Sequence, residues 1–194
     1  MDAAVHVLCD AFADYPVMRF VIGPAGGAYA RRLRAMVEFF TAVRFDTGVV
    51  FGAFPEPGQL AGVANVTLPA PRPMAPPTQA LRETMWRELG EEARARYDEL
   101  GRAWRPLGVE EPNYHLNMIG VRRSVKGRGI GRRLLDAVHE LSDSDPISCG
   151  TTLTTEDPAN VPLYQHFGYR ITGHARISAS VETWGFFRPR AAPS

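Results

Sequence analysis

No apolar segment of the sequence is long enough to span a bilayer, and only two of the 194 residues are cysteines. The first absence argues against a membrane protein. Cys9 and Cys149 are far apart in apolar surroundings, which argues against a disulfide framework and predicts two buried, unreactive thiols in a reducing compartment. The first residues carry no basic stretch ahead of an apolar one, so we expect no signal peptide and a cytoplasmic location.

The sequence also lacks an excess of either charge. Lys and Arg number 22, Asp and Glu number 21, and the net charge is +1. Without a global positive field, we expect neither nucleic-acid nor membrane binding, and any anion site must be local. The histidines show no metal-ligand spacing, so no metal site is expected. The length suits a single domain spanning residues 1–194.

Hydrophobic periodicity predicts a chain of mixed α/β class. Apolar residues recur with helical spacing, and the first helix is expected to end at Pro16. The expected helices occupy residues 3–13, 29–45, 78–104, a segment starting at 130, and 158–167. Strand-like runs occupy residues 49–54, 60–68, 114–121, 147–153, 169–177 and 181–187. The proline-rich segment 69–77 fits neither a helix nor a central strand.

A basic glycine-rich loop between an expected strand and an expected helix carries the strongest functional signal. Residues 126–132 read Lys-Gly-Arg-Gly-Ile-Gly-Arg, and residues 122–133 contain six cations and no acid. Glycines let a ligand approach the backbone, and a helix start offers free N–H groups to an anion. Neither the P-loop nor the dinucleotide fingerprint fits the glycine spacing. The loop therefore suits a ligand with several phosphates, although a turn capping a solvated basic helix would leave the same pattern.

A second motif follows downstream. Asn160 and Tyr164 are four residues apart, on one face of a short helix that precedes Gly168-Tyr169. Together with Gly120-Val121 and the glycine loop, these residues resemble the GCN5-related N-acetyltransferase (GNAT) superfamily over residues 114–169. The resemblance implies an α/β fold with a central mixed, mostly antiparallel sheet flanked by helices. It also implies transfer of the acetyl group of acetyl-CoA to a primary amine. The layout is most similar to puromycin N-acetyltransferase, which implies a small-molecule acceptor.

The resemblance also assigns roles to residues. Tyr164 matches the general acid that protonates the departing thiolate, and His115 matches the position of a catalytic base in histone-acetylating members. Packing roles stay open for both side chains, and Glu156 and Asp157 are alternative bases, although Asp157 also suits a helix cap. The expected cofactor-binding residues are Ile119, Gly120, Val121, Lys126, Gly127, Arg128, Gly129, Ile130, Gly131, Arg132 and Asn160.

Three features depart from the family pattern. Lys126 stands where Arg or Gln is preferred, Thr154 stands where many members carry Glu, and no strand precedes the helix at 3–13. That first strand is therefore either lost or omitted from the start of the chain. The acceptor pocket is less defined: residues 69–104 are a candidate wall, and Trp184 is a candidate border. A non-catalytic CoA-binding regulator and a nucleic-acid-binding module remain as alternatives, and both a monomer and a homodimer are open.

Overall fold

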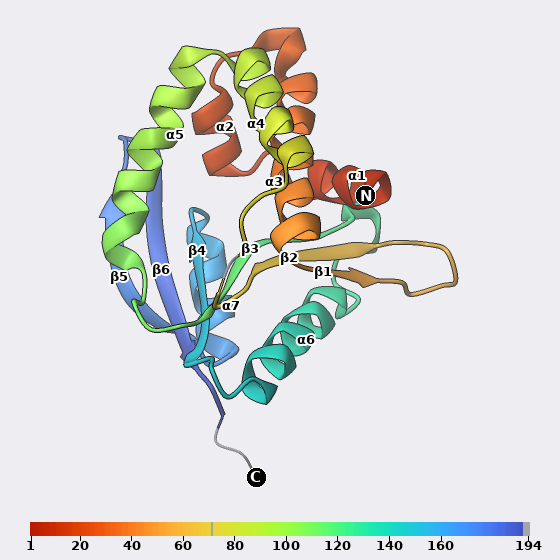
Figure 1. Cartoon of the computed structure of the whole chain (residues 1–194), viewed down its shortest axis with the longest axis vertical. Helices are drawn as coiled ribbons and strands as arrows, with labels where there is room; N and C mark the ends of the chain where they lie inside the picture. Colours follow the sequence, from red (N-terminus) through yellow and green to blue (C-terminus); the bar gives the residue numbers. More distant parts are fainter. Residues whose placement is uncertain (71, 192–194) are drawn as a thin grey trace.

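The computed structural model describes residues 1–70 and 72–191, and its centre is one six-stranded sheet (Figure 1). The strand order is β1-β2-β3-β4-β6-β5. The β3–β4 pair is parallel and the other neighbouring pairs are antiparallel, so the expected mixed, mostly antiparallel sheet is confirmed. The strands are β1 (Gly48–Ala53), β2 (Gly62–Thr67), β3 (Tyr114–Val121), β4 (Gly150–Thr155), β5 (Arg170–Arg176) and β6 (Glu182–Pro189).

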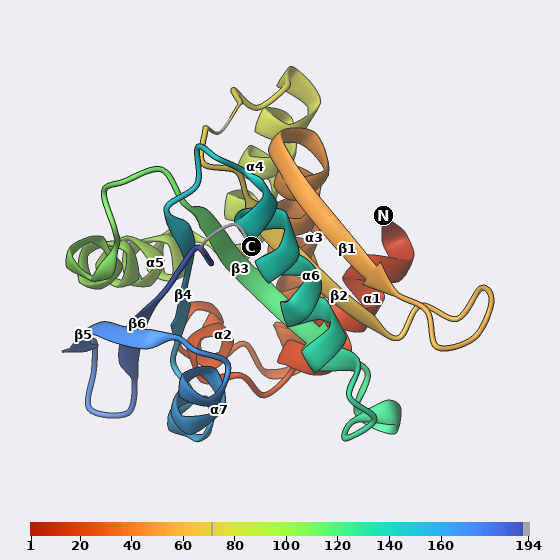
Figure 2. The same cartoon turned by 90° about the horizontal axis from the view of Figure 1, so that it is seen from below.

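Helices cover both faces of the sheet. Figure 2 shows α6 lying across one face, with α1 and α3 on the other. Two clusters of buried apolar side chains fill the spaces between the helices and the sheet, one on each side. None of the helices in the described ranges has the length and apolar character of a membrane span. The helices are α1 (Asp2–Phe12), α2 (Pro16–Ile22), α3 (Tyr29–Thr47), α4 (Pro76–Leu89), α5 (Glu91–Trp104), α6 (Ile130–Ser144) and α7 (Val161–His166).

Three expectations from the sequence were wrong in detail. The helix expected at 78–104 is two helices, because Gly90 adopts φ +84° and its N–H closes α4 on the Trp86 carbonyl at 2.8 Å. Pro16 does not simply end a helix but begins α2, since a proline fits the first helical turn. The strand expected at 147–153 begins at Gly150, after the turn in which Asp145 Oδ1 accepts a hydrogen bond from the Ile147 amide.

The cysteine environments also differ from the expectation. Cys9 and Cys149 are both free thiols, and both are half-buried rather than buried. Burial raises the pKa of Cys9 to about 11, which keeps this thiol protonated and unreactive at neutral pH.

The parallel strands β3 and β4 separate partway along their length. In the described residues their pairing ends at Leu116–Leu153, which leaves the last part of β3 with one open edge. The Arg122 amide donates to the Ala61 carbonyl at 2.8 Å, on the side that faces β2. Since backbone groups alternate in direction along a strand, those of Ile119 and Val121 point toward the open edge. The sheet therefore offers free backbone donors and acceptors where the two strands diverge.

Candidate functional site

A cavity of about 810 Å³ runs along the open edge of β3 and reaches the glycine loop. Its walls come from the α1–α2 connection, the end of β3, the loop with the start of α6, and α7. Ten of the eleven residues expected to bind the cofactor line this cavity, and Arg128 does not. The structure thus brings together segments that lie up to about 150 residues apart in the sequence, around one elongated space.

The glycine loop has the geometry of an anion site. Gly127 and Gly129 adopt φ values of +84° and +74°, and a Cβ at either position would meet no protein atom within 4 Å. These glycines are therefore needed for the backbone conformation, and they leave open space above it. Gly129 precedes α6 without a side-chain cap, and the first helical acceptor, the Gly129 carbonyl, binds the Arg133 amide. No described residue accepts a hydrogen bond from the amides of residues 130–132, which leaves them for a ligand at the positive end of the helix dipole.

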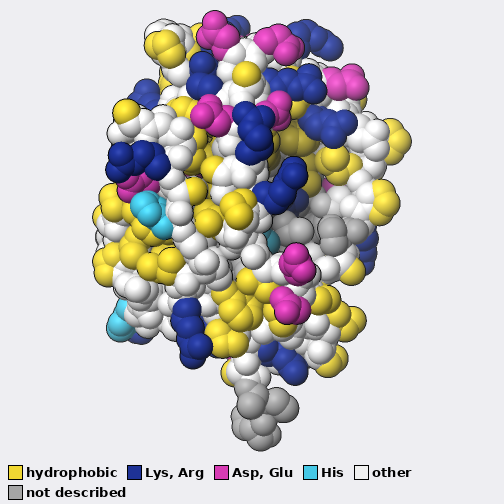
Figure 3. All heavy atoms as spheres, turned by 90° about the vertical axis from the view of Figure 1, so that its left-hand side faces the viewer, with side chains coloured by type: hydrophobic (Ala, Val, Ile, Leu, Met, Phe, Trp, Pro, Cys, Tyr) yellow, Lys and Arg dark blue, Asp and Glu magenta, His cyan; other side chains and the backbone are white. Residues whose placement is uncertain are grey.

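The basic stretch around the loop is less uniformly positive than its sequence indicates. The Arg123 amide donates to Asp10 Oδ2 and its side chain to Asp14 Oδ2, each at 2.8 Å, while Arg122 Nε donates to the Leu60 carbonyl at 2.9 Å. Asp10 and Asp14 thus offset part of the positive charge of residues 122–133, a stretch that contains no acid of its own. Figure 3 also shows Lys, Arg, Asp and Glu side chains mixed on the face of α5. This arrangement weakens the nucleic-acid alternative.

A second cavity, of about 240 Å³, lies on the other side of the strand opening. Its walls are mostly apolar and aromatic, and they come from α1–α3, α5, β3 and β4. The segment expected at 78–104 contributes through α5, whereas no described residue of the proline-rich segment or of α4 lines the cavity. The residues that line both cavities are Phe12, Tyr15, Ile119, Asn160 and Tyr164.

Tyr164 is held by packing and yet keeps its hydroxyl available. The side chain is 7% exposed, and its ring lies against Tyr169 and Phe186 with centroids 5.8 and 5.6 Å away. Among the described residues, the hydroxyl forms no hydrogen bond, in contrast to that of Tyr169, which contacts Thr151 Oγ1 at 3.1 Å. Burial raises the pKa of Tyr164, so the phenol keeps its proton at neutral pH.

Hydrogen bonds define the tautomer of His115. The Asn113 amide nitrogen donates to the carbonyls of Val109 and Glu111, so its oxygen is an acceptor and takes the Thr152 hydroxyl proton at 2.6 Å. Thr152 Oγ1 must then accept from His115 Nδ1, which lies 2.9 Å away. The lone pair of the imidazole is therefore on Nε2.

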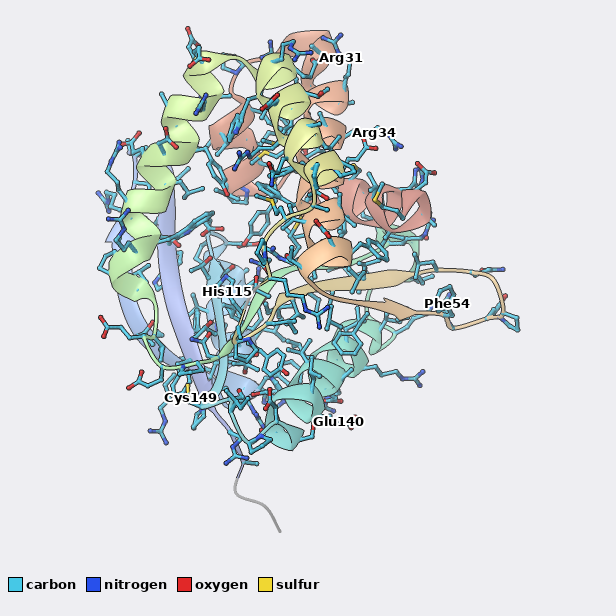
Figure 4. The ribbon with its side chains drawn as sticks, in the orientation of Figure 1. Arg31, Arg34, Phe54, His115, Glu140 and Cys149 are labelled. Carbon is cyan, nitrogen blue, oxygen red and sulfur yellow. The ribbon has the colours of Figure 1, made fainter. Side chains whose placement is uncertain are left out.

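The position of His115 also sets its basicity. Figure 4 shows this residue in the interior of the molecule, and it lines the second cavity. Burial, followed by the nearby positive charge of Arg44, lowers its pKa to about 4. The imidazole is neutral at physiological pH and, with Arg44 charged beside it, a weak base.

Glu156 is a second titratable group on this wall. It is 5% exposed, and Oε1 accepts hydrogen bonds from Thr183 Oγ1 at 2.8 Å and Trp104 Nε1 at 3.0 Å. Burial raises the pKa of its carboxyl group. The neighbouring Asp157 instead accepts from the Ala159 amide at 3.0 Å as the expected cap, and it lines the first cavity.

Sequence reasoning missed several residues of the second cavity. Tyr97 and Trp104 are seven residues apart on α5, a spacing that puts both on one face of a helix but does not show what that face contacts. Arg44 lay in the polar part of its helix pattern, with no signal that it turns inward. Trp184 does not line the cavity but stacks on His174 with centroids 4.8 Å apart.

Comparisons with known proteins agree with this architecture. The family model "Acetyltransferase (GNAT) domain" matches residues 80–183, more than half of the chain. The fold is similar to a Corynebacterium glutamicum structure described as histone acetyltransferase HPA2 and related acetyltransferase, with 21% identity, coverage of 98% and 91% of the two chains, and a TM-score of 0.68. It is also similar to a Drosophila melanogaster polyamine N-acetyltransferase, with 17% identity, coverage of 95% and 91%, and a TM-score of 0.58.

Proposed function

The chain belongs to the GNAT family of acetyltransferases, and from that premise we propose that it acetylates a primary amine of a small molecule. Enzymes of this family take the acetyl group from acetyl-CoA and transfer it to an amine. One observation carries the proposal for this chain: Ile119, Asn160 and Tyr164 line both the long cavity beside the glycine loop and the second, smaller cavity. A donor and an acceptor in the two cavities would meet at these residues.

We place acetyl-CoA in the long cavity, because the hydrogen-bond donors on the wall of this cavity suit the cofactor. The free amides at the start of α6, with Lys126 and Arg132 on the same wall, suit the pyrophosphate. The outward backbone groups of Ile119 and Val121 suit the amides of the pantetheine arm. Of these backbone groups, the Ile119 amide is a candidate hydrogen-bond donor to the thioester oxygen, where negative charge develops during acetyl transfer.

Tyr164 and His115 are the proposed proton carriers. Tyr164 keeps its proton until a thiolate forms beside it, and the dry site raises the proton affinity of the thiolate as well as of the phenol. The incoming ammonium must lose a proton before it can attack. His115 Nε2 is the proposed base, directly or through a water molecule, with the Glu156 carboxylate as the alternative.

Other features support the remaining parts of the proposal. Both apolar clusters pack on the same sheet, which favours one domain over residues 1–194. Two free thiols favour a reducing compartment such as the cytoplasm. The available hydroxyl of Tyr164 argues against the non-catalytic regulator. The narrower likeness to puromycin N-acetyltransferase stays a prediction.

Calorimetric titration with acetyl-CoA, followed by a thiol-release assay over a panel of amines, tests the proposal. We expect saturable binding, and thiol release that depends on one class of small amine. Binding without thiol release for small amines or peptides would support the regulator instead. A folded protein that does not bind acetyl-CoA would refute the placement of the cofactor.

A further inference from the structure

The second cavity contains a cation that no acid of the described chain neutralises. Arg44, near the end of α3, lines the cavity and donates from Nε to Asn117 Oδ1 at 2.7 Å. In the described ranges it forms no ion pair, and burial lowers its pKa. A guanidinium held in an apolar wall is unfavourable unless an anion or hydrogen bonds offset its desolvation. The described part of the chain supplies one hydrogen bond of the five that the group can donate.

Asn117 adds a second donor at the same place. Its Oδ1 accepts from Arg44 Nε and also from Thr67 Oγ1, each at 2.7 Å. With the oxygen occupied by two donors, the amide NH₂ is the polar group left for a ligand, and Asn117 lines the cavity. A guanidinium beside an amide NH₂ makes this end of the cavity a donor site, which suits a carboxylate.

The wall of the cavity also carries an acid, Glu156. Asn117 lies one residue beyond the last β3–β4 pair, and Glu156 lies three residues beyond it. At about 3.3 Å per residue, the two positions are separated by roughly 7 Å along the strands. Glu156 is thus an acceptor group set apart from the donor groups of Arg44 and Asn117, and it lies near enough to Tyr164 to act on its phenol electrostatically.

An aromatic wall runs beside these poles. Phe40 stacks on Tyr97 with centroids 5.8 Å apart, and Tyr97 meets Trp104 edge-on at 6.2 Å. All three line the cavity. The wall offers apolar contact to the side chain of an acceptor that carries groups of opposite charge.

We propose that the acceptor is an amino carboxylate, such as an α-amino acid with an apolar or aromatic side chain. Arg44 and Asn117 bind its carboxylate, and its amine points to the strand opening beside Glu156. The proposal rests on the proposed function, because it takes the second cavity as the acceptor site. A bound carboxylate also offsets the charge of Arg44 next to His115 and thereby strengthens that base.

Matched pairs of amines test this specificity. The thiol-release assay compares L-phenylalanine and L-leucine with their carboxamides and with phenethylamine, at saturating acetyl-CoA. We expect kcat/KM for the carboxylates to exceed that for the analogues without a carboxylate by about 10- to 100-fold. Arg44→Gln should remove this preference, and Arg44→Lys should restore part of it, because lysine keeps the charge but not the planar geometry.

Arg34→Gln is the matched control. Arg34 lies on the same helix, on the outside of the molecule, where it pairs with Asp2 at 2.6 Å (Figure 4). This variant loses the same charge and should keep the preference. Equal use of carboxylates and carboxamides by the wild-type enzyme, or an equal loss for both in Arg44→Gln, would overturn the inference.

Two further outcomes separate this inference from the proposed function. Absence of acetyl-CoA binding would refute the proposed function itself, whereas turnover only of the amines that lack a carboxylate would refute only the carboxylate site. If none of these amines is turned over, calorimetry on the enzyme–CoA complex decides. Binding of L-phenylalanine but not of its carboxamide supports the inference, and any other pattern overturns it.

Discussion

Substitution of Tyr164 by phenylalanine separates the proposed catalytic role of the residue from its packing role. The ring contacts with Tyr169 and Phe186 are kept, because only the hydroxyl is removed. That hydroxyl has no hydrogen-bond partner among the described residues, so no protein group is left unsatisfied. We therefore expect the free energy of unfolding to change by no more than about 0.5 kcal/mol.

The expected effect on turnover is much larger. A positioned general acid contributes about 10²- to 10⁴-fold to a rate. A thiol with a pKa of about 8.5 is a fair leaving group without help, so the lower end applies. We expect kcat to fall about 100-fold, equivalent to about 2.7 kcal/mol in activation free energy, with the affinity for acetyl-CoA nearly unchanged.

Tyr169→Phe is the control variant, because it also removes a tyrosine hydroxyl but at a position outside both cavities. This hydroxyl contacts Thr151 Oγ1 and His139 Nε2, each at 3.1 Å, and its residue lines neither cavity. The control should lose about 1–3 kcal/mol of stability while keeping its kcat. Both variants are measured by urea denaturation, calorimetry with CoA, and thiol release. An unchanged kcat in Tyr164→Phe would show that Tyr164 only packs.

Three other predictions follow from the geometry. Gly129→Glu should weaken acetyl-CoA binding at least 100-fold in calorimetry, because it places a negative charge at the free amides of α6; Gly58→Glu, at a similar φ of +77° outside both cavities, should bind normally. Stability in urea should fall as the pH drops from 6.5 to about 4, because burial lowers the pKa of His115 and of His139 to about 4, so the folded protein excludes protons that both imidazoles bind in the unfolded chain; His115→Gln should remove about half of this dependence. Gly120→Ala should destabilise by about 1–3 kcal/mol, since the added Cβ would lie 2.8 Å from a side-chain carbon of α1, whereas Gly101→Ala, with open space around it, should stabilise by about 0.5–1 kcal/mol. Equal denaturation midpoints for the two alanine variants would contradict the packing argument.

Local signals in the sequence were sufficient for the strand, glycine loop and helix that face the first cavity. The expected strand at Tyr114–Val121 has the observed bounds. The free amides at the start of α6 follow from glycines with positive φ at a helix start, and both properties are encoded by neighbouring residues. The helix boundary at Gly90 was missed because helical periodicity continues on both sides of this glycine.

The sequence by itself determined the family, the sheet class and the position of the glycine loop between a strand and a helix, because each rests on residues close together in the chain. Only the tertiary structure decided what the second cavity contains. Arg44 and Glu156 come from a helix and a strand end far apart in sequence, and they line one space because β3 and β4 separate after Leu116–Leu153. That separation depends on the packing of whole elements against the sheet, which no local pattern of residues records.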